Sequence, residues 1–182
     1  MKKIYYTWAD VESQTQEILR QIALSDWRPD YVVGLTRGGL TPANLISQYL
    51  EVPMECLKVS LRDNAQTESN CWMAEDAFGY NGMGKLVGST KTSNPELRKN
   101  ILIVDDINDS GATLNWIMND WQESCRPYDE AWNNIWNNNV RFAVLVNNAA
   151  SEYKRIDYSS IDINKAEEDS WIVFPWEDWW KN

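Results

Sequence analysis

Short apolar runs and amphipathic stretches follow one another along the chain. The runs have the length of buried strands, and the first, YVVGL, is continuously apolar, which is typical of strands covered on both faces. They are YVVGL (31–35), MECLKVSL (54–61), ILIVDD (101–106) and VRFAVLVN (140–147). The pattern therefore predicts at least four strands.

Helical spacing appears before and between these runs. In the first stretch Thr7 and Asp10 form a possible capping box, ahead of apolar positions at 11, 18, 19 and 22. Residues 40–50 and 111–124 are also expected to be helical, and Pro42 suits a first helical turn. Strands alternating with helices predict a single α/β domain over residues 1–182, with a doubly wound, mostly parallel sheet and helices on both faces. Its ligands should bind beyond the carboxyl ends of the strands.

Two polar segments interrupt this alternation. Residues 62–99 are rich in Gly, Ser, Asn and Thr and far exceed the usual connection of about 4 to 6 residues. They are either a lid or a disordered excursion, and we favour a lid. Residues 126–139 are rich in Asn and Trp. We interpret them as a surface excursion packed on its own tryptophans, the alternative being a short exposed helix with Trp132 and Trp136 on one face.

One glycine-rich stretch has the spacing of a P-loop. GYNGMGKL places Gly79 and Lys85 as that motif requires, but Leu86 stands where a hydroxyl should contact Mg²⁺, and no apolar strand precedes the stretch. The spacing of its glycines also fails the dinucleotide-binding fingerprint. We reject both interpretations.

The amino-acid composition excludes several kinds of partner and of catalytic group. The net charge of −10 argues against a nucleic-acid partner. Histidine is absent, which excludes catalysis and metal binding by imidazole. The three cysteines form no CxxC pair, and the opening MKKIYYTWADVE becomes polar too early for a secretory signal. We expect a cytoplasmic protein that has no membrane segment and binds a small molecule.

The stretch ILIVDDINDSGATLNWI (101–117) combines carboxylates with a phosphate-type loop. The loop Ser110, Gly111, Ala112 and Thr113 opens a helix, whose backbone N–H groups can hold phosphate. Ionised carboxylates only accept hydrogen bonds, so the aspartates suit ribose hydroxyls or a divalent cation. One ligand uses all of these groups: 5-phosphoribosyl 1-pyrophosphate.

This stretch resembles the ligand-binding motif of type I phosphoribosyltransferases. The segments TWADVESQTQEILRQI, VVGLTRGGLTPANLI and EEDSWIVFPWED also resemble, in the same order, those of bacterial xanthine-guanine phosphoribosyltransferases. The resemblance covers nearly the whole chain, apart from the two interruptions. It implies transfer of phosphoribose to a purine base, with guanine, xanthine or hypoxanthine as acceptor and Mg²⁺ as cofactor.

The resemblance also implies roles for individual residues. Asp105 and Asp106 match the pair that binds the ribose hydroxyls, with Asp106 the better candidate for approaching Mg²⁺. The phosphate loop is matched by Asp109, Ser110, Gly111, Ala112 and Thr113, with Asp109 also matching the residue that exchanges a proton with the purine. The pyrophosphate loop is matched by Thr36, Arg37 and Gly38, and the base-binding aromatic residue and its neighbour by Trp171 and Ile172.

The departures and alternatives concern the base and the class of protein. The family has a lysine that contacts the purine 6-oxo group where this chain has Asn148, so Asn148 is our candidate for reading the base.

Several of these residues have an alternative interpretation. Arg37 could be an ordinary surface arginine, and Trp171 could be a residue of the core. The acidic pair could also belong to a receiver-type domain, but the lysine that such a domain needs is missing. A second hypothesis is a non-catalytic relative that binds the same ligand. We also expect a homo-oligomer, a dimer or tetramer. The WEDWW segment is either an oligomer contact or a lid against the base site.

Overall fold

The computed structural model describes residues 1–59, 71–80 and 92–181. Its centre is a five-stranded parallel sheet in the order β3-β2-β4-β5-β6. The strands are β2 (Tyr31–Thr36), β3 (Met54–Lys58), β4 (Ile101–Asn108), β5 (Val140–Asn148) and β6 (Tyr158–Ile163). The prediction of a doubly wound parallel sheet is confirmed, although β6 was not among the expected strands.

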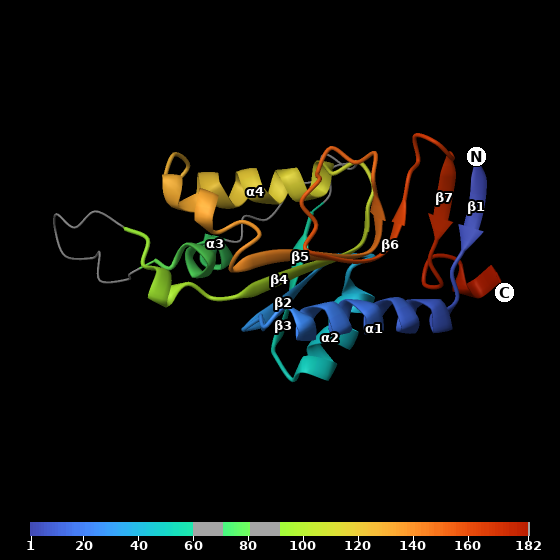
Figure 1. Cartoon of the computed structure of the whole chain (residues 1–182), viewed down its shortest axis with the longest axis horizontal. Coiled ribbons are helices and arrows are strands. Elements are labelled where there is room, and N and C mark those ends of the chain that lie inside the picture. Colours follow the sequence, from blue (N-terminus) through green and yellow to red (C-terminus); the bar gives the residue numbers. More distant parts are fainter. Residues whose placement is uncertain (60–70, 81–91, 182) are drawn as a thin grey trace.

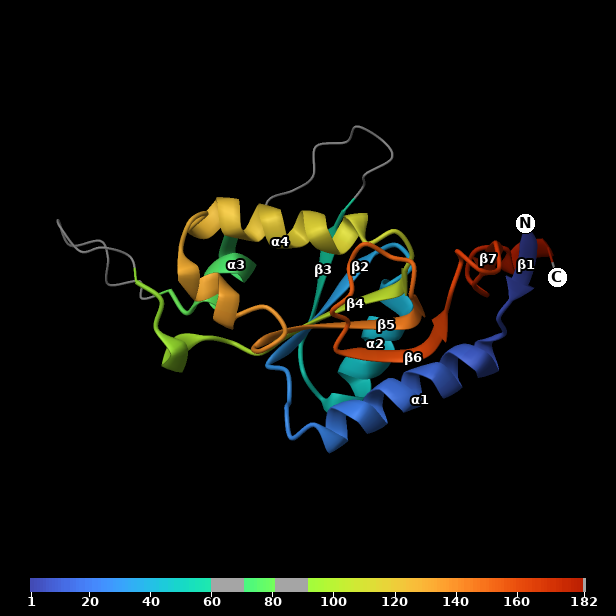
Figure 2. The same ribbon diagram turned by 45° about the horizontal axis from the view of Figure 1, so that its top comes forward.

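Helices cover both faces of this sheet (Figures 1 and 2). On one face lie α1 (Trp8–Leu24) and α2 (Leu40–Leu50), and on the other α3 (Cys71–Phe78) and α4 (Ala112–Cys125). Helix α1 begins with the expected capping box, in which Thr7 and Asp10 each accept a hydrogen bond from the other's backbone N–H. Among the described residues, no helix is both long and apolar enough to span a membrane.

Alternate residues of the central strand face opposite sides of the sheet, and both sides are buried. Ile101 and Ile103 belong to the core beneath α3 and α4, whereas Leu102 and Val104 belong to the core beneath α1 and α2. This double coverage explains why the strand reads as a continuous apolar run. It also fixes the carboxyl end of β4, which carries Asp105 and Asp106.

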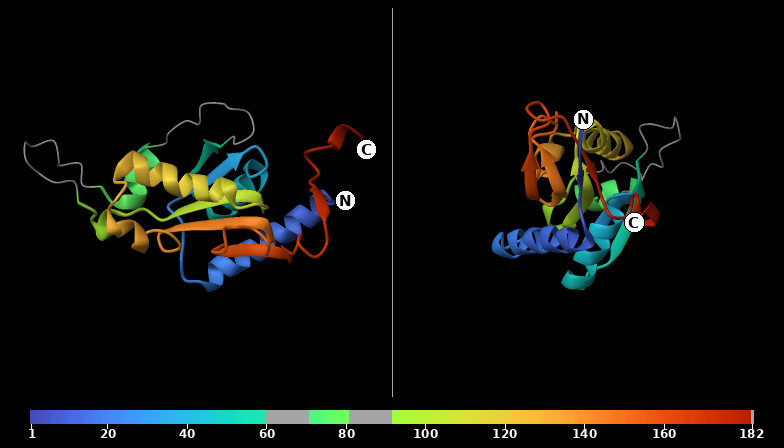
Figure 3. Two further views of the ribbon diagram at one scale, coloured as in Figure 1. Left: turned by 90° about the horizontal axis from the view of Figure 1, so that it is seen from above. Right: turned by 90° about the vertical axis from the view of Figure 1, so that its right-hand side faces the viewer.

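A smaller parallel pair stands apart from the main sheet. Strand β1 (Lys2–Tyr5) pairs with β7 (Ser170–Val173), Lys3 opposite Trp171 and Ile4 opposite Ile172. In Figures 1 and 3 this pair lies at one end of the molecule, and residues near both termini lie side by side there. The sequence pattern did not predict either strand.

Part of the segment assigned to a lid, residues 62–99, packs in the core. Helix α3 places Met73, Ala74, Ala77 and Phe78 in the core against α4, so residues 71–80 are part of the folded body rather than a cover. Gly79 therefore follows a helix, which agrees with rejecting the P-loop. Most of the remaining lid residues, 62–70 and 81–91, lie outside the described part of the chain.

The interpretation of residues 126–139 as a surface excursion did not predict that its tryptophans enter the core. This segment forms a 3-10 helix, Glu130–Asn134, and its Trp132, Ile135 and Trp136 are almost fully buried. Trp132 stacks on Trp136 and contacts Phe78, while Trp136 stacks on Phe142 of β5. The tryptophans therefore close the core between α4 and β5 rather than packing only on one another.

Candidate active site

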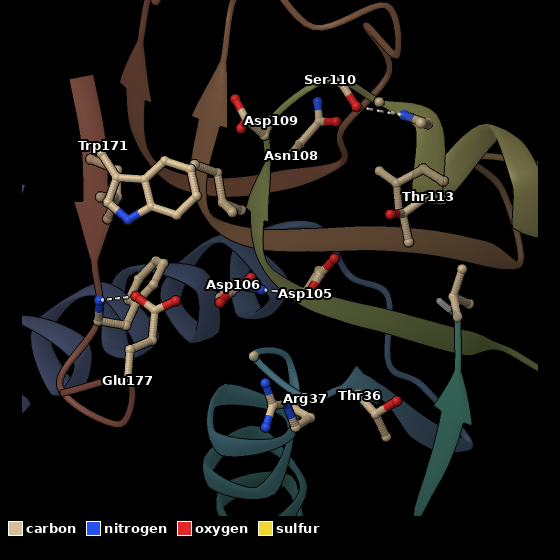
Figure 4. Close-up of a pocket in the computed structure, with 18 of the residues that line it drawn as sticks. Thr36, Arg37, Asp105, Asp106, Asn108, Asp109, Ser110, Thr113, Trp171 and Glu177 are labelled. Atoms are coloured by element: carbon tan, nitrogen blue, oxygen red, sulfur yellow. Dashed lines mark hydrogen bonds between the residues drawn. The ribbon is translucent and has the colours of Figure 1, made fainter. Parts of the chain in front are cut away.

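A pocket of about 840 Å³ lies at the carboxyl ends of β2, β3 and β4, with β7 opposite (Figure 4). This is the position expected for a ligand site in a parallel α/β sheet. The structure brings together nearly all the site residues that the sequence indicated. Those lining the pocket are Thr36, Arg37, Gly38, Asp105, Asp106, Asp109, Ser110, Gly111, Ala112, Thr113, Trp171 and Ile172.

The acidic pair is partly buried at the end of β4. Asp105 Oδ1 accepts a hydrogen bond from the backbone N–H of Asp106, at 3.0 Å. Burial raises the pKa of Asp105 well above its ordinary value, and the charge of Asp106 raises it further. Burial also raises the pKa of Asp106, to about 6. Neither carboxylate forms an ion pair with a described residue, so the pair favours a ligand that brings hydroxyl donors or a cation.

The loop after β2 forms the pocket wall facing this pair. The Thr36–Arg37 peptide bond is cis, and the exposed Arg37 side chain has no ion-pair partner among the described residues. A guanidinium can bind phosphate oxygens through two parallel hydrogen bonds. The position of Arg37 therefore suits an anion.

The loop after β4 leads into the N-terminus of α4. Gly111 precedes this helix with φ +85, and a Cβ built on it would lie 2.4 Å from the backbone nitrogen of Tyr153. Both the positive φ and the close approach require glycine. Ser110 Oγ accepts the Ala112 N–H at 3.3 Å. The helix start thus offers backbone donors and hydroxyls on the side of the pocket where a phosphate is expected.

The opposite wall comes from β7 and the residues after it. Trp171 is partly exposed on the pocket wall, and Ile172 next to it is buried. Glu177, which the sequence analysis did not single out, also lines the pocket, and its Oε2 accepts the Phe174 N–H at 2.9 Å. Its charge is a further cause of the raised pKa of Asp106. An aromatic ring facing carboxylates provides a platform for a flat polar molecule.

Asn148 is the one predicted site residue that the structure does not bring to the pocket wall. Its side chain is buried, and its Nδ2 donates to the Asp109 carbonyl oxygen at 2.9 Å. Its Oδ1 accepts the N–H groups of Ala150 at 3.1 Å and Lys165 at 3.0 Å. Because these bonds occupy both ends of the amide, the assignment of Asn148 as the residue that reads the base is not supported.

Lys165 lines the pocket instead, and the sequence analysis missed it. It lies in the connection from β6 to β7, and its Nζ is 2.9 Å from Asp109 Oδ1. Its position just after the carboxyl end of a parallel strand could have indicated Lys165 as a site residue, but the sequence analysis had not recognised β6. This lysine is the main addition that the structure makes to the site.

Comparison with known proteins settles the family. The sequence profile of the phosphoribosyl transferase domain matches residues 2–178. The chain belongs to this family. It is 24% identical to the hypoxanthine-guanine phosphoribosyltransferase of Schizosaccharomyces pombe, over 96% of this chain and 89% of that one. It is 22% identical to the xanthine-guanine phosphoribosyltransferase of Idiomarina loihiensis, over 97% and 88%. Among solved structures, the Helicobacter pylori xanthine-guanine-hypoxanthine phosphoribosyltransferase superposes with a TM-score of 0.65 at 21% identity, covering 99% of this phosphoribosyltransferase and 97% of that chain.

Proposed function

We propose that this phosphoribosyltransferase transfers phosphoribose from 5-phosphoribosyl 1-pyrophosphate to a purine base, with guanine, xanthine or hypoxanthine as acceptor. The observation that carries the proposal is that one pocket joins an acidic pair, a helix N-terminus and an aromatic platform. Each suits a different part of the reactants. The names of the relatives support a purine acceptor with an oxo group.

The sugar donor fits the half of the pocket formed by the sheet. The backbone N–H groups of residues 110–113 would hold the 5′-phosphate. Asp105 and Asp106 would accept hydrogen bonds from the ribose hydroxyls. Thr36, Arg37 and Gly38 would hold the pyrophosphate, with Arg37 stabilising its charge as it leaves.

Mg²⁺ fits the acidic pair, because burial disfavours these carboxylates as charged groups and a cation would offset that cost. No cluster of three or more metal-binding side chains is found among the described residues. A single carboxylate plus substrate oxygens is the usual magnesium arrangement, and Asp106 is the proposed protein ligand. Bound there, Mg²⁺ would neutralise charge on the pyrophosphate oxygens.

The chain's own residues would then position the base and move one proton. The base stacks on Trp171, and the backbone of Ile172 reads its 2-substituent. As the bond from the ribose C1′ to the pyrophosphate oxygen breaks, a purine ring nitrogen bonds to C1′ and its proton passes to Asp109. The products are a nucleoside monophosphate and pyrophosphate. We propose that the reaction takes place in the cytoplasm, as part of purine salvage, and in a homo-oligomer.

The direct test is pyrophosphate release from 5-phosphoribosyl 1-pyrophosphate and Mg²⁺ with guanine, xanthine, hypoxanthine and adenine offered separately. We expect release with at least one 6-oxo purine and formation of its monophosphate. Tight binding of the donor without release in the presence of any base would instead favour the non-catalytic relative.

A further inference from the structure

Lys165 reaches the base side of the pocket from the connection between β6 and β7. Only 17% of its side chain is exposed, and its Nζ lies 2.9 Å from Asp109 Oδ1. The same Nζ lies 5.9 Å from the centre of the Trp171 ring. The ammonium group therefore stands between the proposed proton acceptor and the proposed stacking platform.

The backbone of Lys165 is held by Asn148. The Asn148 amide accepts the Lys165 backbone N–H through Oδ1 and donates to the Asp109 carbonyl through Nδ2. It thereby ties the Lys165 connection to the loop after β4. Because Asn148 is itself buried at the end of β5, this link anchors both loops to the central sheet.

An ammonium group and an amide differ in what they select. The Lys165 ammonium has three donors and no acceptor, so it can keep its bond to Asp109 while donating to a second oxygen. It would bind a carbonyl oxygen at the edge of a stacked base and would leave an amino group there without an acceptor. A buried donor facing another donor is costly, which makes the selection strong.

We propose that Lys165 donates a hydrogen bond to the 6-oxo group of the purine and sets the preference for oxopurines, and that Asn148 is a positioning residue acting through Lys165. This inference rests on the proposed function, because it concerns the acceptor of that reaction. The base is read from the β6–β7 connection, not from the side chain at the end of β5.

The test compares Lys165→Met with wild type, by kcat/KM for guanine, xanthine and hypoxanthine and for adenine. Adenine is measured as a competitive inhibitor if it is not a substrate. Loss of a charge-assisted hydrogen bond should lower kcat/KM for the 6-oxo purines by about 10- to 150-fold. The value for adenine should stay within about threefold. Lys165→Gln is the second variant if Lys165→Met does not fold.

Lys154→Met is the matched control. Lys154 is exposed, donates to the Ala149 carbonyl oxygen and does not line the pocket, so it should behave as wild type. Equal loss for all four bases, or an unchanged ranking, would overturn the role of Lys165. Failure of the wild-type protein to use any purine would instead refute the proposed function itself.

The role of Asn148 is tested by a double-mutant cycle. Asn148→Ala should lower the preference for 6-oxo purines, but it should have almost no further effect on that preference when Lys165 is already Met. Additive effects in the double variant would show that Asn148 does not act through Lys165. The KM for 5-phosphoribosyl 1-pyrophosphate should stay near the wild-type value in Lys165→Met, and a parallel rise would indicate general damage to the site.

Discussion

Gly38 lies directly against the carboxyl group of Asp106: a Cβ built on Gly38 would come within 1.9 Å of Asp106 Oδ2. The neighbouring Gly39 is equally crowded, but by backbone, because its Cβ would lie 2.3 Å from the carbonyl oxygen of Val104. Gly38 thus leaves room for the Asp106 side chain, while Gly39 allows the β2–α2 turn to pack on β4.

Gly38→Ala should therefore impair the site more than the fold. The methyl group would displace the Asp106 side chain, and we expect affinity for 5-phosphoribosyl 1-pyrophosphate with Mg²⁺ to fall by about tenfold or more, or about 1.4 kcal/mol. Gly39→Ala should instead lower the free energy of unfolding by about 1–3 kcal/mol or more, because backbone must move. Ligand titration and urea unfolding of both variants would separate these effects. Unchanged affinity in Gly38→Ala would show that Asp106 tolerates displacement.

Asp109→Asn should slow transfer while leaving the donor bound. Its carboxylate is the proposed proton acceptor, and such groups contribute about 10²–10⁴ in rate. We expect kcat to fall by this factor and affinity for 5-phosphoribosyl 1-pyrophosphate to change little. Asp162→Asn is the control, because Asp162 is exposed and bonded to Asn147 away from the pocket. Near wild-type turnover in Asp109→Asn would remove Asp109 from the mechanism.

Trp132→Ala should destabilise the whole domain. Only 2% of this side chain is exposed, and it contacts both Phe78 and Trp136, so we expect a loss of about 3–5 kcal/mol in the free energy of unfolding. Tyr128→Ala in the same segment removes a side chain that is 97% exposed, and it should change stability by less than about 0.5 kcal/mol. Urea denaturation measures both. Similar small losses would restore the interpretation of this segment as a surface excursion.

Tyr153 makes stability sensitive to alkaline pH. Burial raises the pKa of its hydroxyl to about 12, against 10 for the unfolded chain. Between these values the folded state holds a proton that the unfolded state has lost, so the stabilisation is full below pH 10 and is lost as the pH rises toward 12. The slope is about 1.4 kcal/mol per pH unit for one group. The free energy of unfolding, measured at pH 9, 10 and 11, should fall less steeply with pH for Tyr153→Phe than for wild type or for Tyr128→Phe. Equal slopes would contradict a buried, neutral Tyr153 hydroxyl.

The parallel sheet was predictable because burial on both faces leaves a direct record in the sequence. Strands β2, β4 and β5 each contain a run of consecutive apolar residues, and their order with α2 and α4 predicts the crossover connections. The stretch from the end of β4 into α4 also predicted its own part of the site, since residues 105–113 are contiguous. These residues are brought together by local chain geometry, which the sequence encodes directly.

The remaining features depend on contacts between distant segments. Strand β6 lies at the sheet edge, and only its first residue, Tyr158, is buried, so Lys165 beyond it had no apolar run to mark it. Trp132 and Trp136 stand among asparagines, and only the packing of α4 against β5 shows that they are buried. Asn148 was placed correctly at the end of β5, but the direction of its amide depends on the loops carrying Asp109 and Lys165.

Because β1 pairs with β7, the two halves of the pocket form from different parts of the chain and at different times. The donor half lies within the main sheet, whereas the platform carrying Trp171 needs residues 2–5 and 170–173 together. A growing chain can complete the first half while the second still lacks a partner strand. Fusions or deletions that displace residues 2–5 would therefore change the selectivity for the base first. Affinity for the sugar phosphate would be preserved.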